Sequence, residues 1–282
     1  MAKSSNIEWT DHTFNPWWGC TKVSPGCKHC YAETWAKRYG HNVWGPTQSR
    51  RFFSPNHWRQ PLKWHKEAVE TGQRARVFCA SMADVFEDHH EIEAERDRLW
   101  ALIEETPMLD WQLLTKRPEN MVKFTPWGDE WPQNVWAMTS IENQEMADKR
   151  LPVVIKVPTA VRGLSVEPLI GPVDLRPWLS DIQWVIVGGE SGPKSRPMHP
   201  DWVRDLRDQC LEFGVSFFFK QWGNWRPVQT EKSGQTLVRV IPGEEHEADQ
   251  FMARMSKKAA GRVLDGHTWN QLPYQHLPVA GD

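Results

Sequence analysis

Three cysteines lie within eleven residues near the start of the chain, and their spacing limits the structure more than any other sequence feature. Cys20, Cys27 and Cys30 form the pattern C-x6-C-x2-C, whose C-x2-C half chelates metals in zinc and iron–sulfur proteins. Thiolates are soft ligands that suit these metals. Because Gly19, Pro25 and Gly26 favour turns, we expect the loop to fold back until the three sulfurs face one point.

The number of thiolates leaves three interpretations of this loop open. A structural zinc ion takes four protein ligands, so His12, His29 or His41 would have to complete a zinc site. A [4Fe–4S] cluster held by three cysteines instead keeps one iron available for a substrate or cofactor. The third interpretation is that the cysteines are packing residues. We favour the cluster.

The rest of the composition is that of a globular chain without an export signal. The net charge is −2 over 282 residues, which argues against a dedicated basic nucleic-acid-binding protein. We find no signal peptide and no apolar run that could span a membrane, so we expect a cytoplasmic protein whose thiols stay reduced. The sequence has 18 Trp against 3 Tyr, and we expect some indole rings to line a ligand site on which bases can stack.

Apolar runs alternate with charged, helix-period stretches along the chain, and this alternation predicts a parallel α/β fold. Strands are predicted over 76–81, 111–115, 134–139, 162–166, 184–187 and 215–219. Helices are predicted over 31–39, 91–105, 144–150 and 200–213, and a loop over 41–65. Because nearly every strand ends in polar residues, we favour a full or partial (β/α) TIM-type barrel over an open sheet. Residues 1–227 form this predicted barrel, and residues 228–282 form a C-terminal extension packing on it.

Five segments of the chain carry a resemblance to a known family: residues 15–20, 26–32, 113–118, 164–169 and 188–192. The cysteine loop among them resembles that of the radical S-adenosylmethionine (radical SAM) superfamily, whose usual motif is C-x3-C-x2-C after the first strand of a barrel. His29 stands where that motif has an aromatic or similarly flat residue. More closely, the chain is similar to a phage-associated family of radical-SAM-like proteins formerly of unknown function.

The resemblance implies a cofactor pair, a [4Fe–4S] cluster on Cys20, Cys27 and Cys30 together with S-adenosyl-L-methionine. Reductive cleavage of the latter would give a 5′-deoxyadenosyl radical. It also implies an electron donor of flavodoxin or ferredoxin type and, if the chain is phage-encoded, a place in the host cytoplasm. The substrate we expect is a modified nucleobase, such as hypermodified thymidine in phage DNA, on which an amino-acid adduct is isomerised; the partner is then DNA or a modified nucleotide. Two alternatives are a zinc-stabilised, non-catalytic nucleic-acid-binding module and a radical repair enzyme for damaged pyrimidines.

The ends of the predicted strands supply the remaining candidate site residues. We expect cofactor contacts from Ser81, Asp84, Thr139, Ser140, Glu142, Ser165, Gly188 and Gly189. Ser81 and Asp84 stand where the superfamily has a Gly-Gly-Glu-like element. The catalytic candidates are Glu167, Glu190, Cys79 and Lys220, and the substrate-binding candidates are Lys116, Arg117, Arg51 and Trp58. Helix capping is an equal alternative around Ser140, and core packing is the alternative for Cys79.

Overall fold

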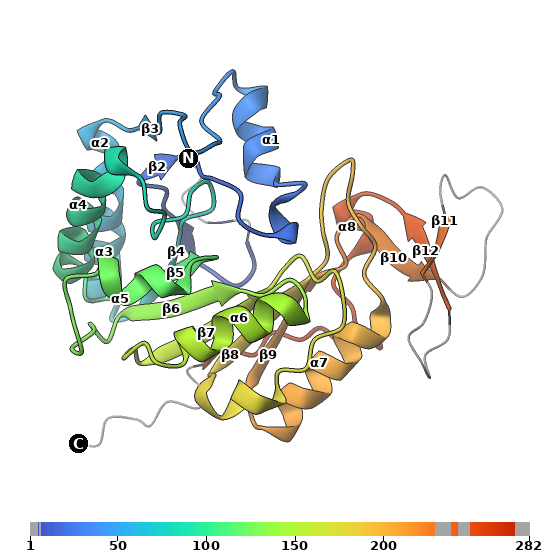
Figure 1. Cartoon of the computed structure of the whole chain (residues 1–282). Coiled ribbons are helices and arrows are strands. Elements are labelled where there is room, and N and C mark those ends of the chain that lie inside the picture. The colour runs from blue at the N-terminus through green and yellow to red at the C-terminus, as the bar shows by residue number, and fades with distance from the viewer. Residues whose placement is uncertain (1–4, 6, 229–237, 242–248, 274–282) are drawn as a thin grey trace. The chain divides into compact units, whose positions relative to one another are not determined.

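A computed structural model describes residues 5, 7–228, 238–241 and 249–273 of the chain. Seven parallel strands form its main sheet in the order β1-β4-β5-β6-β7-β8-β9 (Figure 1). Their bounds are β1 (His12–Thr13), β4 (Ala75–Cys79), β5 (Leu109–Thr115), β6 (Val135–Ser140), β7 (Val161–Val166), β8 (Trp184–Gly188) and β9 (Ser216–Gln221). Among the described residues this order does not close on itself, which confirms the predicted class in its partial form, a partial (β/α) barrel.

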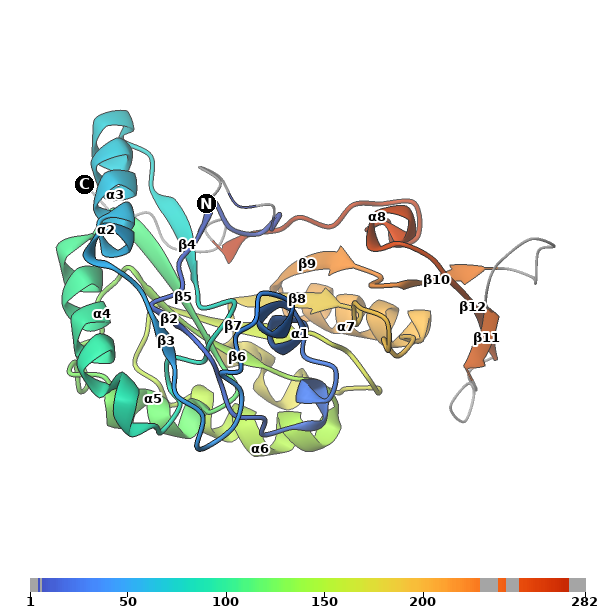
Figure 2. The ribbon, with the colours of Figure 1, turned by 90° about the horizontal axis from the view of Figure 1, so that it is seen from above.

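The chain divides into two compact units, residues 1–139 with 152–162 and residues 140–151 with 163–282. The helices of the first unit are α1 (Tyr31–Arg38), α2 (Pro55–Trp58), α3 (Gln60–Thr71), α4 (Glu93–Glu105) and α5 (Met121–Phe124), with 3-10 turns η1 (Pro25–Cys27), η2 (His90–Ile92) and η3 (Pro118–Asn120). In both views α3 and α4 lie beside β4 and β5 (Figures 1 and 2). A two-stranded ribbon, β2 (Trp17–Trp18) with β3 (Arg51–Phe52), adjoins the cysteine loop.

The predicted loop over residues 41–65 is wrong, because it contains β3, α2 and the start of α3. Pro55 and Pro61, which suggested a loop, stand in the first turns of α2 and α3. Proline is tolerated there because the first amides of a helix have no intrahelical acceptor.

The second unit contains β7, β8 and β9 together with α6 (Gln144–Val154), η4 (Arg176–Asp181) and α7 (Pro200–Glu212). Its tail forms an antiparallel sheet in the order β10 (Trp225–Val228), β12 (Gln250–Arg254), β11 (Val238–Ile241), followed by α8 (Lys257–Ala260). The predicted boundary between residues 227 and 228 stays a prediction.

Strands β6 and β8 are buried along their whole length. Full burial is expected of parallel strands covered on both faces and explains why these segments read as unbroken apolar runs. In the described part of the chain, no helix has the length and apolar character that crossing a membrane requires.

Candidate functional site

The first cysteine is held by contacts on both sides of its backbone. The Gly19 amide donates to the Met82 carbonyl at 3.0 Å, and Cys20 forms an isolated bridge with Trp44. Gly19 has a φ of +123°, and a Cβ there would lie 2.5 Å from the Val43 carbonyl oxygen. Only glycine therefore allows this approach to Cys20.

The other two cysteines lie at the end of η1 and the start of α1. The Cys27 sulfur contacts the Ser24 hydroxyl at 3.6 Å, and Cys30 precedes the first residue of α1. Burial raises the pKa of the Cys30 thiol, and the neighbouring charge of Cys27 raises it further.

The donor set of this loop fits a thiolate-bound cluster in its chemistry. All three cysteines are free thiols and all three are half-buried. Across the described ranges, no three His, Cys, Asp or Glu side chains form a group that could hold a metal ion. The metal role of Cys20, Cys27 and Cys30 therefore stays a prediction, supported by ligand chemistry and by their position in one loop.

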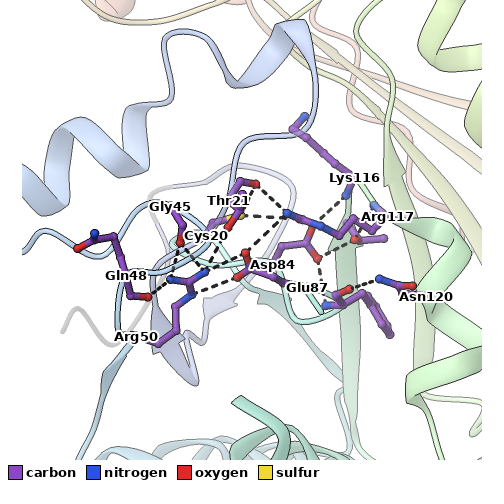
Figure 3. Close-up of polar contacts among 12 residues, drawn as sticks. Cys20, Thr21, Gly45, Gln48, Arg50, Asp84, Glu87, Lys116, Arg117 and Asn120 are labelled. Carbon is purple, nitrogen blue, oxygen red and sulfur yellow. Dashed lines mark hydrogen bonds and ion pairs between the residues drawn. The ribbon is translucent and has the colours of Figure 1, made fainter. Parts of the chain in front are cut away.

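Arg117 connects the cysteine loop to the end of β4 (Figure 3). Its guanidinium donates to the Thr21 carbonyl at 2.7 Å and to Asp84 Oδ2 at 2.8 Å, and its Nη1 lies 3.8 Å from Cys20 Sγ. Burial alone would lower the pKa of Arg117, but the charges of Asp84, Cys20 and Glu87 raise it. The Arg117 side chain is 9% exposed, and its guanidinium hydrogen-bonds to protein atoms.

A second buried arginine, Arg50, continues this network. Its guanidinium pairs with both carboxylate oxygens of Glu87, at 3.1 and 2.9 Å, and donates to the carbonyls of Gly45 and Gln48. Glu87 also lies 3.7 Å from Arg117. Glu87 was not predicted as a site residue. The available signal was a pair of acidic residues three positions apart after a strand, Asp84 and Glu87.

The structure gives the cofactor candidates of the first unit different surroundings. Ser81 is half-buried, and its hydroxyl lies 3.1 Å from the Asn15 side-chain nitrogen. Asp84 accepts four hydrogen bonds within the protein, from the Thr115 hydroxyl, two backbone amides and Arg117. Thr139 is fully buried, and its hydroxyl donates to the Thr115 carbonyl.

The catalytic and substrate candidates of the first unit are mostly buried or engaged. Cys79 is fully buried in β4, and burial raises the pKa of its thiol. Trp58 is buried, with the Arg98 guanidinium 4.3 Å from its ring centroid. Arg51 lies over the Trp18 ring at 4.5 Å. The Lys116 side chain extends away from the arginine–carboxylate pairs (Figure 3).

Near the start of the second unit, Glu142 forms a buried ion pair. Its carboxylate accepts from Arg150 at 2.7 Å, and the same arginine donates to the Ser140 carbonyl. The Asn143 side chain, rather than Ser140, caps α6 by accepting from the Met146 amide. The structure therefore gives Glu142 and the Ser140 backbone a shared partner in Arg150.

Polar side chains gather at the ends of β7, β8 and β9. The Lys220 ammonium donates to both oxygens of Glu167, at 2.9 and 2.8 Å, and the Gln221 amide donates to Glu167 at 3.2 Å. The second Gln221 side-chain atom, Oε1, is buried and has no hydrogen-bond partner among the described residues. A Cβ at Gly188 would lie 3.2 Å from the Glu167 carboxyl, and one at Gly189 would lie 2.2 Å from the Trp222 carbonyl oxygen.

Two other candidates of the second unit are buried. Glu190 accepts from Arg196 through both carboxylate oxygens, at 2.9 and 2.7 Å. Ser165 is buried, and its carbonyl accepts from the Ile141 amide. Arg196 was not predicted as a site residue. A lone arginine in a glycine- and proline-rich loop gave no signal.

The fold and the loop together define the class: a parallel (β/α) protein of the partial-barrel type that carries three free thiols after its first strand. The chain belongs to the family described as "Protein of unknown function (DUF5131)", whose family model matches residues 4–273. Whether this family is associated with phages stays a prediction. No curated protein matches the chain.

Solved structures similar to the chain are forms of spore photoproduct lyase. A mutant with bound AdoMet and dinucleoside spore photoproduct has a TM-score of 0.46 and 13% identity, covering 87% of this chain and 69% of that chain. A second mutant has a TM-score of 0.47 and 13% identity, with 91% and 72% covered. The complex with dinucleoside spore photoproduct has a TM-score of 0.43 and 14% identity, with 84% and 67% covered.

Proposed function

We propose that the chain is a radical SAM enzyme in which Cys20, Cys27 and Cys30 hold a [4Fe–4S] cluster. The observation that carries this proposal is the placement of three free thiols in one loop after β1 of a parallel (β/α) fold. When bound, the reduced cluster supplies the electron that cleaves S-adenosyl-L-methionine into methionine and a 5′-deoxyadenosyl radical. An electron donor of flavodoxin or ferredoxin type is proposed as the partner.

The residues of the first unit position the loop and bind the sulfonium cofactor in this proposal. Ser81 is half-buried and carries a hydroxyl that can accept from the methionine ammonium. Because the oxygens of Asp84 accept four hydrogen bonds within the protein, we assign Asp84 to holding Arg117 rather than to binding the cofactor.

The residues of the second unit suit a substrate that carries both charges of an amino acid. The paired Lys220 and Glu167 offer a cation for a carboxylate and an anion for an ammonium. The buried Gln221 Oε1, unpartnered in the described residues, can accept a hydrogen bond from an amide or ammonium. We therefore propose a nucleobase bearing an amino-acid adduct, such as hypermodified thymidine in DNA, as the substrate. The reaction proposed is isomerisation of that adduct.

The proposal is tested with three DNA substrates and one cofactor. Reduced protein and S-adenosyl-L-methionine are incubated with DNA containing the modified thymidine, with plain DNA and with ultraviolet-irradiated DNA. We expect a nucleoside of unchanged mass and altered chromatographic retention from the modified DNA alone, because the hydrogen atom that the 5′-deoxyadenosyl radical removes from the adduct would be returned to the rearranged adduct by 5′-deoxyadenosine. Reversal of lesions in the irradiated DNA would instead favour radical repair of damaged pyrimidines.

Metal analysis of the same preparation separates the enzyme from a non-catalytic zinc module. We expect iron and acid-labile sulfide in about equal amounts, as a cubane requires. Protein that contains zinc without sulfide, and that forms no 5′-deoxyadenosine under reducing conditions, would contradict the proposed function.

A further inference from the structure

The contacts of Arg117 suggest a role for this residue beyond holding the loop. Its Nη1 is the cationic group 3.8 Å from Cys20 Sγ, and a second nitrogen of the same guanidinium holds the adjoining Thr21 carbonyl at 2.7 Å. Two donors from one rigid fork therefore reach consecutive residues of the loop. This arrangement fixes both the distance and the direction of the charge next to the sulfur.

The charge of Arg117 acts in a buried setting. The Arg117 and Asp84 side chains are 9% and 8% exposed, and solvent screening between them is weak. Asp84 partly neutralises the guanidinium at Nη1, the same nitrogen that faces the sulfur, as the dashed contacts in Figure 3 show. The sulfur thus experiences the difference between two opposed charges, and each can be removed separately.

We propose that Arg117 sets the reduction potential of the cluster by donating a hydrogen bond to the Cys20 sulfur, with Asp84 opposing it. This inference rests on the proposed function. The step concerned is the transfer of one electron from an external reductant to the cluster, with no bond made or broken. A nearby donor and positive charge stabilise the more negative reduced form and so raise the potential.

The test is a redox titration of the anaerobically loaded protein, followed by the EPR signal of the reduced cluster. Arg117→Gln removes the cation, and we expect its midpoint to shift to a more negative potential. Asp84→Asn removes the opposing anion, and we expect a shift in the positive direction. Arg117→Lys keeps the positive charge but lacks the planar guanidinium with its several N–H donors. We expect its midpoint potential to shift in the negative direction by less than that of Arg117→Gln.

Arg74→Gln is the matched control, because it removes an arginine of the same unit that pairs with Asp110 at 2.6 Å. We expect its midpoint to equal that of the wild type. The inference would be overturned, with the proposed function left intact, if cluster-loaded Arg117→Gln had the wild-type midpoint potential. The same holds if the midpoint potential shifted in the same direction in Arg117→Gln and Asp84→Asn. If Arg117→Gln does not retain the cluster, the inference is decided by the directions in which the midpoint potential shifts in Arg117→Lys and Asp84→Asn. Shifts in the same direction would overturn it. Wild-type protein that takes up no iron and sulfide would overturn the proposed function as well.

Discussion

At the residue scale, the five cysteines fall into two environments. Cys20, Cys27 and Cys30 are half-buried in one loop, whereas Cys79 and Cys210 are fully buried in β4 and α7. A metal ligand must be able to lose its proton and reach the metal, whereas a buried thiol in an apolar setting packs as a small hydrophobic group. The two groups should therefore respond differently to substitution.

We expect Cys20→Ala, Cys27→Ala and Cys30→Ala each to lose most of the iron and sulfide bound after anaerobic reconstitution. The physical reason is that each removes one of three thiolates. Cys210→Ala is the control, and it should bind as much iron as the wild type. Iron and sulfide are measured colorimetrically, and equal iron in Cys27→Ala and Cys210→Ala would contradict the assignment of Cys27.

The buried pair of Glu142 and Arg150 gives a second prediction at this scale. Glu142→Gln leaves the Arg150 charge uncompensated in the interior, and we expect a loss of about 3 kcal/mol in the free energy of unfolding. Asp174→Asn, which removes an exposed partner of Arg176, should cost about 0–1 kcal/mol. Urea titrations of both variants give the comparison, and equal losses would count against the buried pair.

At the element scale, close contacts between strand ends depend on small residues. A Cβ at Gly189, directly after β8, would lie 2.2 Å from the carbonyl oxygen of Trp222, which follows β9. We expect Gly189→Ala to lower the free energy of unfolding by roughly 1–3 kcal/mol, since the backbone must shift to accept the methyl group. Gly171→Ala, where the nearest atom would be 3.7 Å away, is the control and should unfold at nearly the wild-type denaturant concentration.

Helix α2 contributes a pH-dependent contact. His57 stacks on Phe53 with ring centroids 4.3 Å apart, and its Nε2 lies 2.8 Å from the Asn15 carbonyl oxygen. Burial lowers the pKa of His57, and the charge of Arg51 lowers it further. Between this lowered pKa and the unfolded value of about 6.5, the unfolded chain binds a proton that the folded chain does not.

We therefore expect the free energy of unfolding to fall as the pH drops below about 6.5, and His57→Gln to weaken this dependence. Each unit by which folding lowers the pKa of His57 reduces the free energy of unfolding at low pH by about 1.4 kcal/mol. Burial also lowers the pKa of His89, so part of the slope should remain in the variant. Identical pH profiles for wild type and His57→Gln, from urea titrations at pH 5.5 and 7.5, would contradict this prediction.

At the scale of the whole molecule, the sequence predicted the parallel α/β fold better than it predicted the site. Buried strands such as β6 and β8 carry unbroken apolar runs, so their position could be identified. The helices within residues 41–65 were missed because Pro55 and Pro61 occupy first turns, a position that composition does not reveal. The sheet of β10, β11 and β12 was missed because its strands are short.

The site is harder to predict because its contacts join residues far apart in the sequence. The candidate residues at strand ends could be chosen from their position, but their partners could not. Arg50 reaches Glu87 and Arg117 reaches Cys20 across separations of 37 and 97 residues. Arg117 is buried among protein partners, and its predicted role in substrate binding stays a prediction. No local pattern reports such pairings, since they depend on how loops pack.

The central claim is that three cysteines hold a cluster with one iron open to S-adenosyl-L-methionine. EPR spectroscopy of the reduced, anaerobically loaded protein with and without this compound tests it most directly. The account predicts a signal typical of a reduced [4Fe–4S] cluster whose g-values shift when S-adenosyl-L-methionine is added, because the added ligand binds an iron. A signal unchanged by S-adenosyl-L-methionine, or loaded protein that contains zinc and gives no signal, would contradict the account.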